Sequence, residues 1–367
     1  MYPLPMRTLW TLGMVVAVAA ACGGDDGNAT TGAGGTNTGT SSGTNTGTGG
    51  TNTGTSSGTN TGTNTGMGGM GGTPDPGPNV DLTDPQLYDV DFTPDDADPA
   101  ADERLGTQHA MLDTRVTPLG YLVVFLHGAG DPGNCGSTAH LEMLAGLGFH
   151  TMSPCYHSGY GVGNCGDDIE GCRLEAFEGV DHHAQIDVSP PNSTETRVTK
   201  AMEYLQTQVP EGDWTYFIDG DTPRWDRILI TGSSHGASSS GVIGLHRNVV
   251  RVVSLAGPLD SNQAWLSSSG LTPKSEYWGF THTDDGQHPG HLDAFETLGL
   301  PGAPTNVDDV APPYGGSHRL FSDLASVSNG HGAVTAGGAS PQAGGDWVYL
   351  PVWTTMYTEG LPSNFNP

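Results

Sequence analysis

One pentapeptide combines the residue types that nucleophilic catalysis requires: positions 232–236 read Gly-Ser-Ser-His-Gly, a G-x-S-x-G pattern. A short apolar strand is expected before it, at 227–231, and a helix after it, at 237–246. A tight strand-to-helix turn of this kind holds a serine in a strained conformation, and its flanking glycines let the turn close without a Cβ clash. The Ser234 hydroxyl would then lie at a helix N-terminus, which favours negative charge. The pattern therefore predicts Ser234 as a nucleophile.

A second motif reads His-Gly-Ala-Gly at positions 127–130 and follows a continuous apolar run at 121–126, the pattern of a strand buried on both faces. With these two motifs in this order, the chain resembles the α/β-hydrolase superfamily of serine esterases, lipases and related enzymes over roughly residues 105–360. The resemblance implies that the backbone N–H groups of Ala129 and His235 form an oxyanion hole. Backbone donors aimed at developing negative charge stabilise the transition state of acyl transfer.

A nucleophilic serine needs a base, and the superfamily order along the chain is Ser, then acid, then His. The base is expected in a loop after the last strand. His331 lies in the sequence Asn-Gly-His-Gly after the weak strand at 318–321, so His331 is the predicted base. His318 is the alternative, although it begins that strand. The other candidate histidines, all beyond the G-x-S-x-G motif, are His246, His282, His288 and His291.

The acid of the triad is expected after the strand at 277–281, where the sequence offers Asp284 and Asp285. The chain is similar here to prolyl-peptidase-like members of the superfamily, in which the first Asp of such a pair serves, and this resemblance implies Asp284. Asp285 is the next candidate. Asp260, after the preceding strand, is a known alternative position in the superfamily.

The elements that must position these residues alternate between strand and helix. Strands are expected at 88–92, 108–113, 121–126, 149–154, 227–231, 249–255, 277–281 and 318–321, and helices at 138–147, 193–209, 237–246 and 288–298. This alternation predicts an α/β fold with a mostly parallel central sheet and helices on both faces. The resemblance implies that this is the α/β-hydrolase fold, and the domain is expected to span residues 80–367. Residues 156–192 are Gly-rich, polar and cysteine-bearing, and are expected to form a lid or insertion.

Four cysteines remain in the part of the chain expected to fold, and their even number favours two disulfides in an exported protein. Three pairings are possible. The favoured one joins Cys165 to Cys172 across a short loop and Cys135 to Cys155 at the ends of neighbouring strands. A zinc site is the alternative, but the sequence contains no CxxC pair.

The N-terminal residues 1–22 have the pattern of an export signal, with Arg7 before an apolar run too short to span a bilayer stably. Small residues precede Cys22, which resembles the lipidated cysteine of a bacterial lipobox, although Ala19 stands where Leu is usual. The sequence predicts an exported lipoprotein anchored to a bacterial membrane of the cell envelope. An ordinary secretory signal with an incidental cysteine is the alternative.

Residues 23–79 are low-complexity Gly, Thr, Asn and Ser, and predict a disordered tether. The formal net charge of the whole chain is −28. Nucleic acids and anionic lipid surfaces are disfavoured as partners because both need Lys and Arg for binding. We expect a monomer that contacts the membrane only through its lipid anchor, and polyanionic substrates are disfavoured.

Two clusters have metal-ligand residue types without a strong ligand spacing: Asp181-His182-His183 with Asp187, and His288, His291 and Asp293. No metal or cofactor is therefore predicted, and weak calcium binding by the acidic surface stays open. The leading hypothesis is an exported serine hydrolase that cleaves carboxylic esters through an acyl-enzyme. The alternatives are a serine peptidase or amidase on the same scaffold, and a tethered binding module without catalysis.

Overall fold

The computed structural model describes residues 75–260, 262–325 and 327–365. The predicted export signal, Cys22 and the tether up to residue 74 lie outside this range. Within the described residues, no helix combines the length and apolar character needed to cross a membrane.

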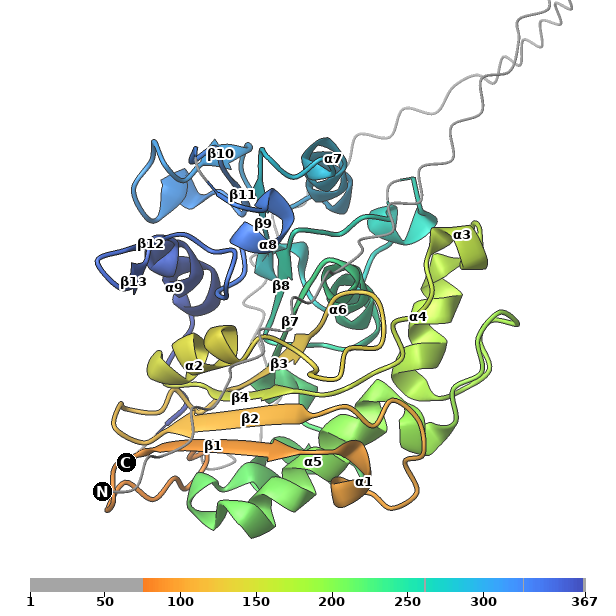
Figure 1. Ribbon diagram of the computed structural model, residues 1–367, viewed down its shortest axis with the longest axis vertical. Coiled ribbons are helices and arrows are strands. Elements are labelled where there is room, and N and C mark those ends of the chain that lie inside the picture. The colour runs from red at the N-terminus through yellow and green to blue at the C-terminus, as the bar shows by residue number, and fades with distance from the viewer. Residues whose placement is uncertain (1–74, 261, 326, 366–367) are drawn as a thin grey trace, which may run out of the picture. The chain divides into compact units, whose positions relative to one another are not determined.

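The centre of the fold is a twisted sheet whose strand order is β1-β2-β4-β3-β7-β8-β9-β11-β10 (Figure 1). β1, β2 and β4 pair antiparallel, and every pairing from β4 through β3 to β10 is parallel. The sheet therefore has the mostly parallel arrangement that the sequence predicts. Its strands are β1 (Leu87–Phe92), β2 (Gln108–Asp113), β3 (Leu122–Leu126), β4 (His150–Ser153), β7 (Ile228–Ser233), β8 (Arg251–Leu255), β9 (Tyr277–His282), β10 (Thr305–Asn306) and β11 (Arg319–Ser322).

Helices cover both faces of this sheet, which gives the α/β-hydrolase fold. They are α1 (Pro94–Ala97), α2 (Thr138–Gly146), α3 (Val162–Cys165), α4 (Ile169–Glu178), α5 (Thr194–Gln208), α6 (His235–His246), α7 (His288–Leu298), α8 (Gly330–Ala333) and α9 (Leu350–Thr358). Two short hairpins lie outside the sheet, β5 (Ile218–Asp219) with β6 (Thr222–Pro223) and β12 (Gln342–Ala343) with β13 (Asp346–Trp347).

The apolar core is divided by the sheet because successive side chains of a strand point to opposite faces. In β3, Leu122, Val124 and Leu126 join the core beneath α4, α5, α6 and α7. Val123 and Phe125 join the core beneath α2, α8 and α9. Both faces of the central strands are buried, which explains their continuous apolar runs.

The segment 156–192, expected as a lid or insertion, contains α3 and α4. Ile169, Cys172 and Phe177 of this segment are buried in the core that also holds α5 and α6. The structure forms the disulfides Cys135–Cys155 and Cys165–Cys172, so the favoured pairing is confirmed.

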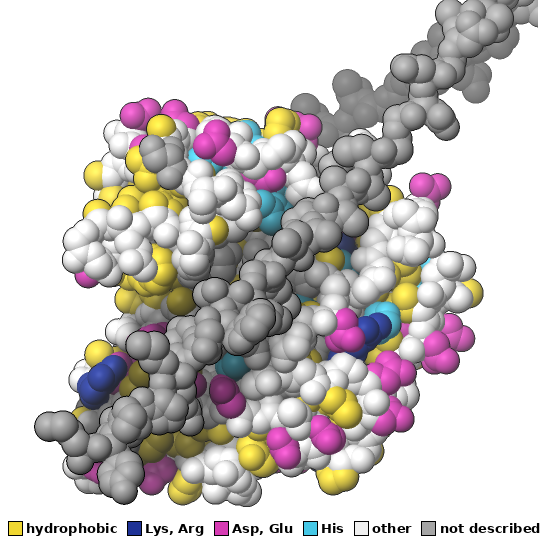
Figure 2. All heavy atoms as spheres, in the orientation of Figure 1, with side chains coloured by type: hydrophobic (Ala, Val, Ile, Leu, Met, Phe, Trp, Pro, Cys, Tyr) yellow, Lys and Arg dark blue, Asp and Glu magenta, His cyan; other side chains and the backbone are white. Residues whose placement is uncertain are grey.

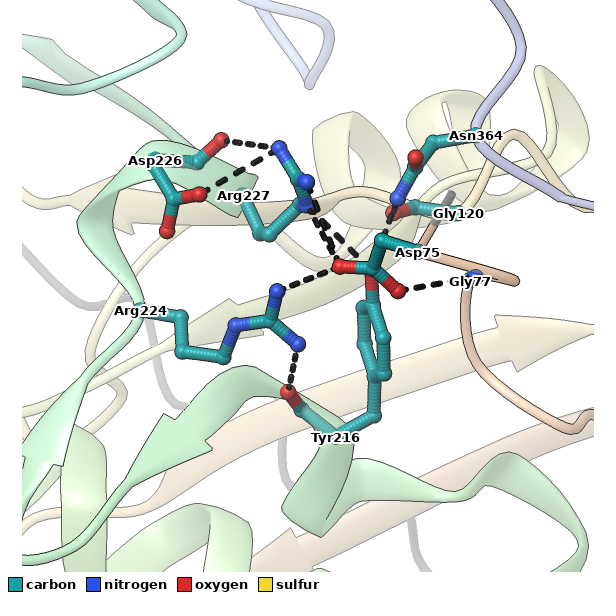
Figure 3. Close-up of polar contacts among 8 residues, drawn as sticks. All are labelled: Asp75, Gly77, Gly120, Tyr216, Arg224, Asp226, Arg227 and Asn364. Atoms are coloured by element: carbon teal, nitrogen blue, oxygen red, sulfur yellow. Dashed lines mark hydrogen bonds and ion pairs between the residues drawn. The ribbon is translucent and has the colours of Figure 1, made fainter. Parts of the chain in front are cut away.

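The start of the described chain is held by ion pairs at the amino edge of the sheet, where the N-terminal ends of the parallel strands lie (Figure 3). The Asp75 carboxylate accepts hydrogen bonds from Arg224 and Arg227, which precede β7, and from the Tyr216 hydroxyl. Burial alone would raise the pKa of Asp75, but these contacts lower it below the ordinary value. Residues 75–79, which the sequence assigns to the tether, therefore lie against the folded domain.

The surface is acidic, as the net charge requires. On the face drawn in Figure 2, acidic side chains are spread widely, whereas Lys and Arg side chains show at only a few places.

Candidate active site

Ser234 lies in the strand-to-helix turn that its motif predicts, between β7 and α6. Its backbone has φ 58° and ψ −116°, a conformation that L-residues rarely adopt. A Cβ on Gly236 would lie 2.0 Å from the Leu126 carbonyl oxygen, and a Cβ on Gly232 would lie 2.4 Å from the Gly236 carbonyl carbon. Both flanking positions therefore require glycine, as the motif implies.

His331 and Asp285 meet at the same edge of the sheet as Ser234. His331 Nδ1 lies 2.7 Å from Asp285 Oδ2. Asp285 follows β9 and His331 lies in α8, after β11, so both come from the carboxyl ends of parallel strands. A Cβ on Gly330 would lie 2.4 Å from the Asp284 carbonyl carbon, so glycine there allows the two loops to approach closely.

The surroundings of the Asp285 carboxylate favour its ionised form. Its side chain is 4% exposed, and its second oxygen accepts a hydrogen bond from the Gln287 N–H at 3.0 Å. Burial alone would raise the pKa of Asp285, but the hydrogen bonds from His331 and Gln287 outweigh burial and lower it. His331 is 34% exposed at its side chain, so its imidazole also faces outward.

The hydrogen bonds of the described residues include none between Ser234 and His331. The structure thus joins the predicted base to an acid and leaves the predicted nucleophile as a separate, partly exposed group on the same sheet edge.

Asp284, the acid implied by the resemblance, is not the partner of His331. Its side chain is exposed, and its backbone N–H donates to His282 Nδ1 at 3.0 Å. The chain turns here, with the Asp285 N–H bound to the His282 carbonyl, so that Asp285 rather than Asp284 is buried beside His331. The acid that contacts the predicted base is therefore Asp285, the second candidate, and not Asp284.

The remaining alternatives are occupied elsewhere. Asp260 is bound at both oxygens by Arg173, with Nε–Oδ2 and Nη2–Oδ1 distances of 2.8 Å. His318 precedes β11 at the amino edge of the sheet, where its ring stacks on Trp278 with centroids 3.5 Å apart. Neither residue can therefore complete a site at Ser234 in this arrangement.

The two sequence clusters with metal-ligand residue types do not converge. The His288 and His291 imidazoles both lie near the Thr281 hydroxyl, at 3.4 and 2.8 Å, whereas Asp293 is exposed. In the other cluster, His182 Nε2 contacts Glu178 at 2.7 Å.

One group found among the described residues brings His183 within 4.8 Å of the sulfurs of Cys165 and Cys172. Those sulfurs are bonded to each other, so they are not thiolate ligands.

The predicted oxyanion loop contacts the nucleophile turn. A Cβ built on Gly128 would lie 3.6 Å from Ser234 Cβ, an ordinary contact distance. Among the hydrogen bonds of the described residues, the backbone N–H groups of Ala129 and His235 have no acceptor. Both are therefore free to bind a ligand oxygen.

His127 orients this loop. Its Nδ1–H donates to the Gly128 carbonyl oxygen at 2.8 Å, and burial lowers its pKa to about 4, so the ring is neutral. Because a trans peptide is planar, fixing the Gly128 carbonyl directs the Ala129 N–H to the opposite side. The Ser158 hydroxyl donates to the Gly130 carbonyl at 2.6 Å and fastens the far end of the loop.

A charged hollow adjoins the oxyanion loop. It has a volume of about 370 Å³, and an ion pair between Arg104 and Asp131, at 2.9 Å, lies in its wall. Asp131 directly follows Gly130 in the loop. The lining residues are Glu103, Arg104, Asp131, His157 and Asp187.

Comparison with models of known protein families found no match, and comparison with curated proteins found none either. Among solved structures, the chain is similar to a dienelactone hydrolase-like promiscuous phosphotriesterase from metagenomic libraries. The identity is 14%, the coverage is 74% of this chain and 95% of that one, and the TM-score is 0.36.

Esterase B from Lactobacillus rhamnosis is 12% identical, with coverage of 58% and 72% and a TM-score of 0.35. A fluorophosphonate-binding serine hydrolase F of Staphylococcus aureus is 11% identical, with coverage of 60% and 89% and a TM-score of 0.32. At these identities and TM-scores, the likenesses carry no argument about the activity of this chain.

Proposed function

We propose that this protein is a serine hydrolase that cleaves carboxylic esters through a triad of Ser234, His331 and Asp285. The observation that carries the proposal is the 2.7 Å contact between His331 and buried Asp285, on the sheet edge where Ser234 occupies a strained turn. A buried carboxylate on Nδ1 leaves Nε2 as the proton acceptor, which is the arrangement that a general base requires.

The reaction begins when Ser234 Oγ attacks the ester carbonyl and His331 Nε2 takes the hydroxyl proton. Asp285 stabilises the imidazolium, and the N–H groups of Ala129 and His235 donate hydrogen bonds to the carbonyl oxygen as it gains negative charge. His331 then protonates the departing alcohol. Water, deprotonated by the same imidazole, releases the acid and restores Ser234.

The contact between Ser234 and His331 forms when substrate binds. Catalytic hydrogen bonds are often long in the free enzyme and tighten in the complex with substrate. The side chains of both residues are partly exposed, so each has room to rotate.

Esters are favoured over peptides as substrates. The feature that pointed to peptidases was the resemblance at the Asp284-Asp285 pair, in which the first Asp is the acid, whereas here the second Asp contacts His331. The acidic surface and the three carboxylates of the hollow beside the oxyanion loop disfavour polyanionic substrates.

We also propose that the enzyme is an exported, monomeric lipoprotein, anchored through Cys22 to a membrane of the bacterial cell envelope. The export and the anchor rest on the N-terminal sequence alone. Replacement of Cys22 by Ser should release the protein from membranes, and unchanged retention would refute lipidation.

A fluorophosphonate probe tests the catalytic proposal because it reacts covalently with an activated serine. The wild type should be labelled, Ser234→Ala should not, and Ser233→Ala should retain labelling as a control in the same turn. A panel of p-nitrophenyl esters and aminoacyl amides should show hydrolysis of the esters. Labelling that survives in Ser234→Ala, or a folded wild type that neither reacts nor cleaves esters, would overturn the proposal.

A further inference from the structure

A fully buried cation lies behind the nucleophile turn. The Arg173 side chain, on α4, is 3% exposed and is paired with Asp260, which is equally buried. Trp265 Nε1 donates to the same carboxylate at 3.0 Å. Burying an ion pair carries a large desolvation cost, so stability alone is a weak explanation for this pair. We therefore expect a role in the neighbouring nucleophile turn.

The third nitrogen of this guanidinium reaches the first turn of α6. Arg173 Nη1 lies 2.9 Å from Ser239 Oγ, 3.3 Å from the His235 carbonyl oxygen and 3.4 Å from His235 Nε2. Nη1 has two hydrogens for these three acceptors, and because arginine can only donate, its contact with His235 Nε2 requires that this ring nitrogen carry no proton.

The contacts of His235 Nδ1 independently indicate the same tautomer, with the proton on Nδ1 and none on Nε2. His235 Nδ1 lies 2.9 Å from the Tyr156 hydroxyl oxygen, and that hydroxyl donates to the His127 carbonyl at 2.8 Å. A hydroxyl has one hydrogen, so Nδ1–H must donate to the tyrosine oxygen. Burial, followed by the nearby Arg173 charge, lowers the pKa of His235 well below its ordinary value, so the ring is neutral.

These contacts form one directed chain of donors, from Arg173 through His235 and Tyr156 to the His127 carbonyl. The chain starts on α4, passes through the residue that follows Ser234 and ends at the loop that carries Ala129. We propose that Arg173 and Tyr156 are positioning residues. They fix the position of the Ala129 N–H relative to the His235 N–H, so that both donors of the oxyanion hole can bind one oxygen. The proposal rests on the proposed function, because it assigns the chain to that reaction.

Tyr160 offers a matched control. Its ring packs edge-on against His235, with centroids 4.7 Å apart, and the Arg173 guanidinium lies 5.9 Å from its centroid. Among the described residues its buried hydroxyl has no hydrogen-bond partner. Tyr156→Phe therefore breaks the chain, whereas Tyr160→Phe removes a hydroxyl from the same pocket that makes none of the chain's hydrogen bonds.

The kinetic test compares the two variants on a p-nitrophenyl ester that the wild type cleaves. Loss of an oxyanion donor lowers kcat by about 10²–10³-fold, so displacement of a donor should lower kcat by about tenfold. We expect this loss in Tyr156→Phe with KM within about twofold of the wild type, and little change in Tyr160→Phe. An unchanged kcat in Tyr156→Phe, or equal losses in both variants, would overturn the proposal.

A second variant tests the guanidinium. Arg173→Lys keeps the charge but cannot contact Asp260, Ser239 and His235 together. It should lower kcat in the same way as Tyr156→Phe, and wild-type kcat would overturn the assignment. If this variant fails to fold, Tyr156→Phe still decides the proposal.

The tautomer of His235 is a readout that does not depend on activity. In ¹⁵N-labelled wild-type protein, with the His235 signals assigned from a His235→Asn variant, Nδ1 should be protonated and Nε2 bare. An imidazolium or a proton on Nε2 would overturn the chain even in an active enzyme. A correct tautomer in a protein without esterase or probe reactivity would instead refute the proposed function.

Discussion

Two charged clusters at opposite edges of the sheet differ in burial and in what they hold. At the amino edge, Asp75 binds two arginines whose side chains are 23% and 24% exposed. At the carboxyl edge, Arg173 and Asp260 are each 3% exposed. The first cluster fastens a chain terminus within reach of water, whereas the second lies against the nucleophile turn. The same kind of ion pair therefore serves attachment in one place and positioning in the other.

The largest expected effect comes from breaking the buried pair. Asp260→Asn keeps the shape of the side chain but leaves the Arg173 charge without its counterion. We expect a loss of about 3–5 kcal/mol in the free energy of unfolding, measured by urea denaturation, because an unpaired buried charge is strongly destabilising. A loss below about 1 kcal/mol would show that water reaches Arg173. The two clusters would then not differ in how strongly their ion pairs are buried.

The disulfide beside Arg173 should have an intermediate effect. Cys172 directly precedes Arg173, and its bond to Cys165 restrains the start of α4. Replacing both cysteines with Ser should reduce the free energy of unfolding by about 2–3 kcal/mol, because the unfolded chain gains freedom. It should also lower kcat, since α4 carries Arg173. Unchanged stability and kcat would show that α4 is held by its packing alone.

The smallest effect is expected at the amino edge. Asp75→Asn should lower the free energy of unfolding by about 1 kcal/mol or less, because the partners are partly exposed, and this loss should shrink at high salt. The kcat should not change. A clear fall in kcat would contradict the assignment of this cluster to attachment.

The pH dependence of the Asp75 contribution has a definite sign. Its pKa is lowered in the folded state, so the stabilisation is fully present above the unfolded pKa of about 3.9. It is lost as the pH falls below that value toward the lower folded pKa. The difference between wild type and Asp75→Asn should therefore be constant near neutral pH and vanish in strong acid.

The sequence predicted the features that local physics determines. The turn at Ser234 depends on glycines at 232 and 236, between a strand and a helix, and all of these signals lie within twenty residues. The apolar run at 121–126 likewise indicated a strand buried on both faces, and the His-Gly motif that follows located the loop beside Ser234. Such short-range patterns were sufficient for the central sheet.

The choice between Asp284 and Asp285 was beyond the sequence, because it depends on the direction of one turn. Neighbouring carboxylates in a turn point to different sides, and only the contact with His331 decides which is buried. The Arg173–Asp260 pair joins residues 87 positions apart. Nothing in the Gly-rich segment around Arg173 indicated that the Arg173 side chain on α4 would be buried against the nucleophile turn.

The most direct test of the account compares Asp285→Asn with Asp284→Asn. Loss of the Asp285 charge should favour the wrong tautomer of His331, so kcat for ester hydrolysis should fall by about 10³–10⁴-fold. Asp284→Asn, at the exposed neighbouring position, should leave kcat within about twofold of the wild type. Equal activity in Asp285→Asn and the wild type, or a large loss in Asp284→Asn alone, would contradict the triad of Ser234, His331 and Asp285.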